Sequence, residues 1–440
     1  MSSFANSTTR IIDPVYDRKN QRLEFRLHPD TLYLSNMRLL NIGITSDNGA
    51  DNYNKALGAY GAIRSISLLD GSQLLDQLQI VPVVQTFKNL NRRNDTQLST
   101  GRELYWSNYG FTSQGKYTVN ANAIQRSSIK VNIQNPNNAL AGKEAWISLR
   151  DCLSFLENSM SVPTNVYRQL RLVVEYNSPS VLKFLCNNEN ATHNTTENAL
   201  LVVDEVNDGD LKERMMKEYK GVVFKPLEVD SVVVEGGNSA GGGGATDPFN
   251  SLANTATGSR IKQSKSYLLN GFNDKKLHRL AIAQTPTSSA TWVNANVNTG
   301  LASVASVAQF HNELQVRVNG SNKLAGQGQS QSVTGDGSNR KLRFLNDTWG
   351  VSNVVQGFNS TGTNKQADYL ATDVVPLVGE QQFLGLRIGE YIRELQIFYN
   401  RDGVFNNPKS TQQLTLNVIG EVEKAVIVNS DNSYNVVYAQ

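Results

Sequence analysis

Between residues 63 and 76 the chain reads IRSISLLDGSQLLD, and this stretch points to a β-rich fold. An apolar run that reaches Leu69 is halted by Asp70-Gly71, a pair that favours a tight turn because both residues tolerate unusual backbone dihedrals. A second apolar run begins directly after the turn, at Gln73. The stretch therefore predicts two strands joined by a short turn.

The composition of the whole chain agrees with a β-rich fold. Its 440 residues include 49 Asn and 33 Gly, and Asn alone outnumbers the 39 acidic residues. Asn is unfavourable inside helices and favourable in turns, because its side chain bonds to nearby backbone groups and tolerates left-handed dihedrals. A chain of this length accommodates two domains. We therefore expect many strands joined by elaborate loops, and neither a helix bundle nor a Rossmann-type enzyme.

Charge and hydropathy exclude two further classes of protein. The 42 basic and 39 acidic side chains leave a formal net charge of +3, without the basic stripe of a nucleic-acid binder. The clusters around Arg18-Lys19 and Arg92-Arg93 are short, so we expect no sequence-specific binding of nucleic acid. The mean hydropathy is −0.38. Since no window approaches the run of about 18 apolar residues that a membrane span requires, no transmembrane segment is predicted.

The cysteines and the first residues indicate synthesis in a reducing compartment. Cys152 and Cys186 are too few for a disulfide framework, and both lie in apolar surroundings. The opening MSSFANSTTR lacks the apolar core of a signal peptide. We therefore interpret the sequons at 190–192 and 194–196 as by-products of a loop rich in Asn and Thr, not as glycosylation sites.

Patterns along the chain divide it into four parts. Residues 1–21 are polar and predict an extended N-terminal arm, which we expect a neighbouring subunit to order. The first domain covers 22–207, a connector covers 208–228, and the second domain covers 229–440. Strands of the first domain are expected at 23–27, 32–44, 62–69, 124–133, 170–177 and 200–206.

Two helices are expected among these strands. In the first, at 148–160, Ser148 and Asp151 form a capping pair, apolar residues recur at helical spacing, and Pro163 follows the end. The second opens at Asp208 and is closed by Gly221. Its Glu213 and Lys217 form an i,i+4 pair, and we interpret this helix as the connector between the domains.

Two short motifs recur after similar intervals. The pattern L-x-V-x-Y-N at 172–177 returns as L-x-I-x-Y-N at 395–400, which is 223 residues later. The pattern Y-L-x-N at 33–36 returns at 267–270, which is 234 residues later. These similar offsets suggest a duplicated all-β domain.

No constellation of residues indicates catalysis. The stretch GNSAG at 237–241 matches the G-x-S-x-G elbow of hydrolases, with Ser239 as nucleophile, but glycines follow where that motif needs a helix. Cys152 lies on the apolar face of the first expected helix, which favours core packing over reactivity. Four histidines show no spacing typical of metal ligands: His28, His193, His278 and His311. We predict no catalytic, cofactor-binding or metal-binding residue, and no enzyme activity.

Several segments, taken in order, resemble the double jelly-roll major capsid proteins of double-stranded DNA viruses. That family includes nucleocytoplasmic large DNA viruses, virophages and polinton-like viruses. Residues 63–76 resemble a strand-turn-strand signature early in the first roll of that family, which usually has Gly-Gly in the turn. The other segments that carry the resemblance are 148–160, 170–176, 200–204, 211–214, 269–277 and 318–320.

Two family features are missing from the chain. The segment LNGFNDKKL at 269–277 resembles a family segment that reads Phe-Asn-His-Pro-x-Lys-x-Leu, but His278 falls too late for its His-Pro position. The Pro-Ser-Gly loop of the large viruses is also absent. The resemblance therefore favours a relative with a small genome, such as a virophage.

The resemblance implies an all-β fold of two tandem antiparallel jelly-roll β-sandwiches with short connecting helices. It also implies a structural major capsid protein that forms a homotrimer, a pseudo-hexagonal capsomer of an icosahedral capsid. Its partners would be neighbouring capsomers and the minor capsid and vertex (penton) proteins of a virion assembled inside the host cell. The Asn- and Gly-rich insertions would then be surface loops between strands: 107–123, 187–198, 236–260 and 319–340.

Three other functions agree with the same residues. The chain could be a carbohydrate-binding or adhesive β-sandwich surface protein, a minor capsid protein of the same virus class, or a jelly-roll hydrolase that uses Ser239. An obligate trimer that forms shells would favour the capsomer, whereas a monomer that binds glycan would favour the lectin. Deletion of the arm at 1–21 is expected to leave trimers intact and to impair shell assembly.

Overall fold

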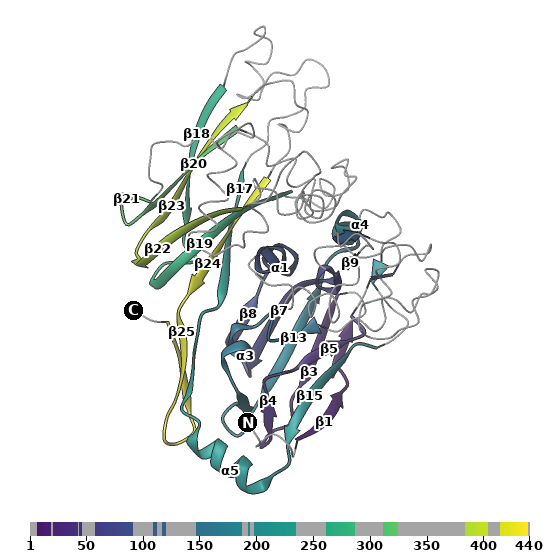
Figure 1. Cartoon of the computed structure of the whole chain (residues 1–440). Coiled ribbons are helices and arrows are strands. Elements are labelled where there is room, and N and C mark those ends of the chain that lie inside the picture. The colour runs from purple at the N-terminus through teal and green to yellow at the C-terminus, as the bar shows by residue number, and fades with distance from the viewer. Residues whose placement is uncertain are drawn as a thin grey trace. The chain divides into compact units, whose positions relative to one another are not determined.

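The computed structural model of the chain is shown in Figure 1. It describes residues 7–18, 21–42, 44–45, 58–90, 109–111, 117–119, 147–186, 192–193, 198–234, 261–286, 311–323, 383–403 and 414–438. The strand expected at 124–133 and the loop 236–260, with Ser239, lie outside the described residues. So do most residues of the other three insertions.

The chain forms two compact units. Unit 1 consists of Met1–Lys88, Asn94–Glu228 and Glu421–Ala439, and nearly all of unit 2 is Val229–Gly420. The sequence pattern predicts that all of 229–440 belongs to the second domain. In the structure, the last strands of the chain instead belong to unit 1.

The hairpin predicted at 63–76 is present in unit 1. Strand β7 (Ile63–Asp70) pairs antiparallel with β8 (Gln73–Leu78), and Asp70 lies directly opposite Gln73. Gly71 has a φ of +58°, the left-handed conformation that the turn requires and that glycine adopts without strain. The carboxylate of Asp70 accepts a hydrogen bond of 2.6 Å from the backbone N–H of Gln169. This hairpin is therefore tied to the loop that precedes the next strand of its sheet.

Unit 1 contains two large antiparallel sheets. In one sheet the strand order is β2-β3-β13-β7-β8, and in the other it is β11-β5-β15-β4-β12, with β1 also paired to β15. Both sheets contribute fully buried side chains to the core, such as Phe25 and Leu68 from the first and Leu32 and Leu201 from the second. The bounds are β1 Ser7–Ile12, β2 Tyr16–Arg18, β3 Arg22–Arg26, β4 Leu32–Leu34, β5 Arg38–Leu40, β11 Ile147–Ser148, β12 Ser161–Pro163, β13 Leu170–Tyr176 and β15 Leu200–Val206.

Unit 2 contains two sheets of four strands each. Their strand orders are β17-β24-β19-β22 and β18-β23-β20-β21. Buried residues include Leu277, Val316 and Ile397. The bounds are β17 Leu227–Val234, β18 Ile261–Leu269, β19 Lys275–Pro286, β20 His311–Val318, β21 Ser321–Asn322, β22 Phe383–Ile392, β23 Leu395–Gly403 and β24 Leu414–Val422.

The two units repeat one strand topology. In unit 1 the two sheets contain the strand orders β1-β15-β4-β12 and β3-β13-β7-β8. In unit 2 the corresponding strand orders are β17-β24-β19-β22 and β18-β23-β20-β21. Within the described residues, each set contains eight strands, and corresponding strands follow one another in the same order along the chain. Two four-stranded antiparallel sheets connected in this way form a jelly roll. The chain therefore has the predicted all-β fold of two tandem jelly rolls.

In residues 7–18, the main described part of the N-terminal arm predicted at 1–21, the chain forms strands β1 and β2 and not a free arm. Strand β1 pairs with β15 over its whole length, from Ser7 opposite Val206 to Ile12 opposite Leu201 (Figure 1). Ile12 is buried, whereas the other residues of the strand are not. Because one residue alone points into the core, the sequence lacks the alternation that signals a strand. This strand belongs to the first roll and needs no neighbouring subunit to pair.

The helix predicted at 148–160 is shorter and is capped differently. Ser148 lies in β11, and helix α3 covers only Ser154–Asn158, with Leu153 at its N-cap. The backbone N–H of Phe155 donates instead to the carboxylate of Asp76 at 2.8 Å. The helix is therefore capped by a side chain from β8, a long-range contact that a local sequence pattern does not reveal.

Two helices of unit 1 were not predicted. Helix α1 covers Val81–Leu90 and α4 covers Pro179–Cys186. Pro179 occupies the first helical position, where its missing N–H costs nothing, and the Ser178 hydroxyl lies 3.5 Å from the N–H of Val181. The pair Ser178-Pro179 is thus a local signal in the sequence for the start of this helix.

A third sheet of unit 1 contains the C-terminal strands. Its strand order is β16-β25-β26, with bounds Gly221–Phe224, Lys424–Val428 and Tyr434–Tyr438. The ammonium group of Lys424 is buried and donates to the carbonyl of Leu75 at 2.9 Å. The Tyr434 hydroxyl donates to the carboxylate of Asp70 at 2.8 Å. Both contacts fix the C-terminal strands to the hairpin at 63–76.

One of the two sequence repeats lies on corresponding strands. The motif at 172–177 falls on β13 and its copy at 395–400 falls on β23, the same position in the two rolls. The motif at 33–36 falls on β4, but its copy at 267–270 falls on β18, which corresponds to β3. The second repeat is therefore unrelated to the duplication, although the duplication itself is present.

Candidate functional site at helix α5

The residues considered for catalysis do not gather into a site. Ser239 lies outside the described residues, as do the side chains of Cys186 and His311. Cys152 is buried in the turn before α3, and the amide nitrogen of Gln85 lies 3.5 Å from its sulfur. His193 is also buried, 2.6 Å from the carbonyl oxygen of Asn177, so it serves the packing of unit 1.

The described residues contain no candidate metal site and no candidate membrane-spanning helix. Among them, no group of three or more His, Cys, Asp or Glu side chains has an arrangement that would hold a metal ion. None of the helices in the described part of the chain is long and apolar enough to cross a membrane.

A pocket does exist in unit 1, and helix α5 (Gly209–Glu218) forms one of its walls. The helix begins as the sequence predicts, because the Asp208 carboxylate accepts a 3.0 Å hydrogen bond from the N–H of Leu211. The predicted ion pair between Glu213 and Lys217 is also present at 2.6 Å. Both side chains are mostly exposed, so the pair adds little to stability.

The C-terminal end of α5 is held by a cluster of tyrosines. The hydroxyl groups of Tyr167 and Tyr219 lie 2.9 Å apart, and the ring of Tyr434 packs edge-on against that of Tyr167, at 5.1 Å between centroids. Burial raises the pKa of Tyr219 to about 12 and raises the pKa values of Tyr167 and Tyr434 as well. These phenols therefore stay protonated at neutral pH and act as fixed structural groups.

Two turns form the wall opposite α5, and one buried threonine joins them. The Thr164 hydroxyl accepts from the N–H of Thr31 at 2.7 Å and lies 2.8 Å from the carbonyl oxygen of His28. The N–H of Thr164 also donates to the carbonyl of Thr31. Asp30 and Asn165, which line the pocket, are the sequence neighbours of Thr31 and Thr164, so their backbone is held in place by these bonds.

A third turn, at 429–433, closes the pocket. The N–H of Asn429 donates to the carbonyl of Ser433 at 2.8 Å, and the carboxylate of Asp431 accepts from both the N–H and the hydroxyl of Ser433. These bonds lower the pKa of Asp431. Asn432 adopts a φ of +62° at the tip of this turn. The turn is thus held by its own hydrogen bonds.

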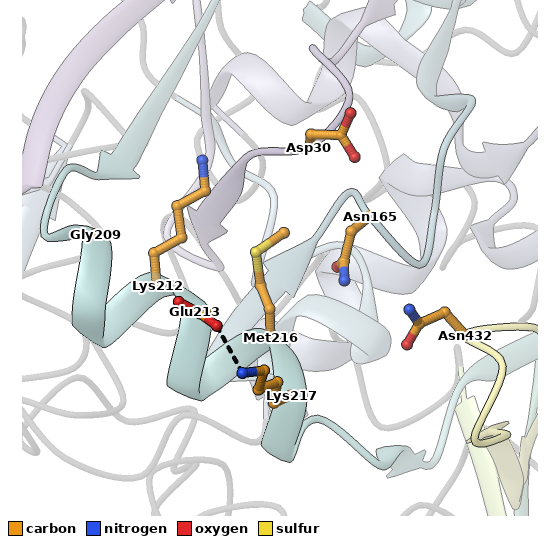
Figure 2. Close-up of a pocket in the computed structure, with 8 residues that line it drawn as sticks. All are labelled: Asp30, Asn165, Gly209, Lys212, Glu213, Met216, Lys217 and Asn432. Atoms are coloured by element: carbon orange, nitrogen blue, oxygen red, sulfur yellow. Dashed lines mark hydrogen bonds and ion pairs between the residues drawn. The ribbon is translucent and has the colours of Figure 1, made fainter.

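The pocket has a volume of about 380 Å³. Figure 2 shows side chains from the three turns on one side and α5 on the other, with the Met216 side chain between them. It is lined by Asp30, Asn165, Gly209, Lys212, Glu213, Met216, Lys217 and Asn432. These residues come from four separate stretches of the chain, so no local motif could have revealed the pocket.

The lining of the pocket is polar and charged. Among the eight lining residues there is no Ser, Cys, Thr or His that could act as a nucleophile or base of a triad. The charged groups are two carboxylates and two ammonium groups, and Glu213 and Lys217 neutralise each other. The arrangement can therefore receive hydrogen-bonding and charged groups of a partner.

No family model matches the chain, and no curated protein matches it. Solved structures do match over nearly its whole length. VP54 of PBCV-1, fitted into a cryo-EM reconstruction of the virophage Sputnik, has a TM-score of 0.50 at 11% identity, and the match covers 99% of this chain and 97% of VP54.

Two further matches are structures from the Sputnik virophage and from mavirus. The 3.5 Å cryo-EM structure of Sputnik has a TM-score of 0.49 at 9% identity, covering 100% of this chain and 89% of that chain. The mavirus major capsid protein has a TM-score of 0.47 at 10% identity, and the match covers 98% of this chain and 90% of the mavirus chain. Because the sequence identity is so low, the comparison with VP54 shows only that the two chains share a fold. Together with the repeated strand order, it identifies the chain as a double jelly-roll protein.

Proposed function

We propose that this chain is the major capsid protein of a double-stranded DNA virus. The observation that carries the proposal is the presence of two jelly rolls with one strand order in a single chain. Three such chains around a threefold axis supply six similar rolls, which gives a trimer with a nearly hexagonal outline. Blocks of that outline tile an icosahedral shell.

We also propose the domain division, the structural role and the partners that the sequence predicts. The rolls are divided at the connector 208–228, and the chain acts as a structural protein of the virion, without enzymatic activity or sequence-specific binding of nucleic acid. Its partners are two further copies of itself, neighbouring capsomers, and minor capsid and vertex proteins. The balance of 42 basic and 39 acidic residues supports such packing, since many copies with a high net charge would repel one another.

The solution mass of the purified chain, measured by light scattering, tests this function directly. A stable species of about three chain masses, seen as hexagonal blocks by electron microscopy of the same fraction, is the expected result. A clean monomer would contradict the proposal and would turn attention to glycan binding by a β-sandwich surface protein.

A further inference from the structure

Strand β26 forms one edge of the C-terminal sheet of unit 1. It pairs with β25, and its other side has no partner among the described strands. The register is continuous from Tyr434 opposite Val428 to Tyr438 opposite Lys424, without a bulge. Native proteins usually protect a free edge with a charged residue, a proline or a bulge. The strand reads YNVVY and contains none of these, so this edge is open to pairing.

The hydrogen bonds of the hairpin show which backbone groups of β26 point to the free edge. The N–H of Asn429 donates to the carbonyl of Ser433 at 2.8 Å, so Ser433 faces β25. Backbone groups alternate in direction along an antiparallel strand, and every second residue after Ser433 therefore also faces β25. The N–H and C=O groups of Tyr434 and Val436 point the other way, where no described strand lies to bond them.

The sequence of β26 matches a second copy of the same strand. Two copies that pair antiparallel about a twofold axis at Val436 place Val436 opposite itself and Tyr434 opposite Tyr438. In this register the edge-facing backbone groups of both strands lie opposite one another, so the two Val436 residues bond reciprocally. Aromatic and β-branched cross-strand pairs add to the stability of a sheet. Backbone and side chains thus favour the same partner.

The outer face of the sheet beside this edge is exposed and uncharged. Val437 is 39% exposed, and Asn435 is also exposed. Ile427 lies opposite Asn435 on the neighbouring strand and is 50% exposed. Because none of the three carries a charge, a second copy of the chain can approach this side of the sheet without repulsion between like charges.

We propose that β26 is a contact between two copies of this chain, in which the two β26 strands pair antiparallel about a twofold axis at Val436. The C-terminal sheets of the two copies then form one continuous sheet. The pairing follows from the edge itself and does not require the proposed function.

The place of this contact in an assembly does rest on the proposed function. A twofold contact cannot lie inside a trimer with threefold symmetry, so it joins neighbouring trimers. One short strand from each copy buries far less than the roughly 800 Å² per partner of a stable interface. The contact is therefore weak between two isolated chains and becomes effective where many trimers meet at once.

Disulfide cross-linking of the full-length chain tests the register. In the proposed pairing, Asn435 lies opposite Val437 of the second copy, with Cα atoms about 4.5 Å apart, which suits a disulfide. We expect a mixture of Asn435→Cys and Val437→Cys chains to give a cross-linked dimer on a non-reducing gel after oxidation by air and copper. Each variant alone should give little, because identical residues of the two copies are diagonal neighbours about 7–8 Å apart. The parent chain gives the background from its own two cysteines.

A second pair of variants tests the backbone bonds. Val436→Pro removes an N–H that points away from β25, so it blocks pairing with another copy and leaves the hairpin bonds in place. Val436→Ala is the matched control, since it shortens the same side chain and keeps the N–H. Added to the cysteine variants, proline should abolish the cross-link and alanine should preserve it. Circular dichroism of both variants checks that they fold.

Three results would overturn the proposal. They are no cross-link in the mixture at the highest soluble concentration, equal cross-linking by the mixture and by each variant alone, and a cross-link that persists in a folded Val436→Pro chain. Trimers that form without the cross-link would reject this contact and leave the proposed function intact. A monomeric chain that still gives the cross-link would have the opposite meaning.

Discussion

Asp76 shows how one buried side chain can organise two elements. It is 2% exposed, accepts from the N–H of Phe155 at 2.8 Å, and accepts from the N–H of Gln77 at 2.8 Å. The first bond caps α3 and the second lies within β8. The carboxylate therefore joins the hairpin at 63–76 to the short helix that packs against it.

Replacing Asp76 should destabilise unit 1. Asp76→Ala leaves the N–H of Phe155 buried without an acceptor, and we expect a loss of about 2–3 kcal/mol in the free energy of unfolding. Asp76→Asn, which keeps one carbonyl acceptor, should lose less. Urea unfolding monitored by fluorescence measures both variants. An unchanged midpoint for Asp76→Ala would show that the bond to α3 contributes nothing.

His193 makes the stability of unit 1 sensitive to acid. It is 3% exposed, its ring packs at 4.8 Å from that of Tyr176, and its Nδ1 is buried without a partner among the described residues. Nε2 donates to the carbonyl of Asn177, whose own side chain donates to the carbonyls of Gly61 and Ile63. Burial lowers the pKa of His193 below 6.5. The folded chain therefore favours the neutral ring.

The sign of the pH dependence follows from that direction. Because the folded pKa lies below the unfolded value, the contribution of His193 is fully present above pH 6.5 and is lost as the pH falls from 6.5 through the folded pKa. His193→Gln keeps a donor for Asn177 but does not titrate. The free energy of unfolding, measured at about pH 7.5 and about pH 5, should fall less between the two pH values for this variant than for the parent chain. An equal fall in both chains would exclude His193 as the acid-sensitive group.

Among the secondary-structure elements, those determined by neighbouring residues can be predicted from the sequence, whereas those determined by distant contacts cannot. The turn at Asp70-Gly71 and the capped start of α5 at Asp208 were read correctly because the residues that determine them are neighbours in sequence. Helix α3 was misread because its cap, Asp76, lies on another strand. The α5 pocket escaped prediction for the same reason, since Asp30, Asn165 and Asn432 meet only after folding.

The pairing of β16 with β25 depends on a glycine. Gly221 has a φ of +105°, and a Cβ added there would lie 1.8 Å from the carbonyl oxygen of Val426. We expect Gly221→Ala to cost about 3 kcal/mol or more, because the strands must separate or the backbone must change.

Gly209→Ala is the matched control for that change. Gly209 has an ordinary φ, and no atom lies within 4 Å of the position that its Cβ would take. Alanine at this helical position should be neutral or slightly stabilising. The melting temperatures of both variants, measured by thermal unfolding, test this contrast. If Gly221→Ala melts as high as Gly209→Ala, the close approach to Val426 is relieved at little cost.

At the scale of the whole molecule, removal of the N-terminal segment is now expected to affect the fold and not only assembly. A chain that starts at Gln21 lacks β1 and exposes the edge of β15 from Leu201 to Val206. Unpaired edges favour aggregation. We expect lower thermal stability and poor recovery of this chain relative to one that starts at Ser7, both measured by calorimetry and gel filtration. Equal stability of the two chains would restore the idea of an independent arm.

The return of the C-terminal strands to unit 1 constrains how the protein is made. Tyr434 bonds to Asp70, and Lys424 bonds to Leu75, so residues of the first hairpin meet partners that are synthesised about 350 positions later. On the ribosome, the N-terminal roll emerges long before those partners exist. The hairpin must remain partly uncovered until residues 424–434 have also been synthesised. Folding of unit 1 is thus completed late in synthesis, and the incomplete roll is a candidate for binding by chaperones.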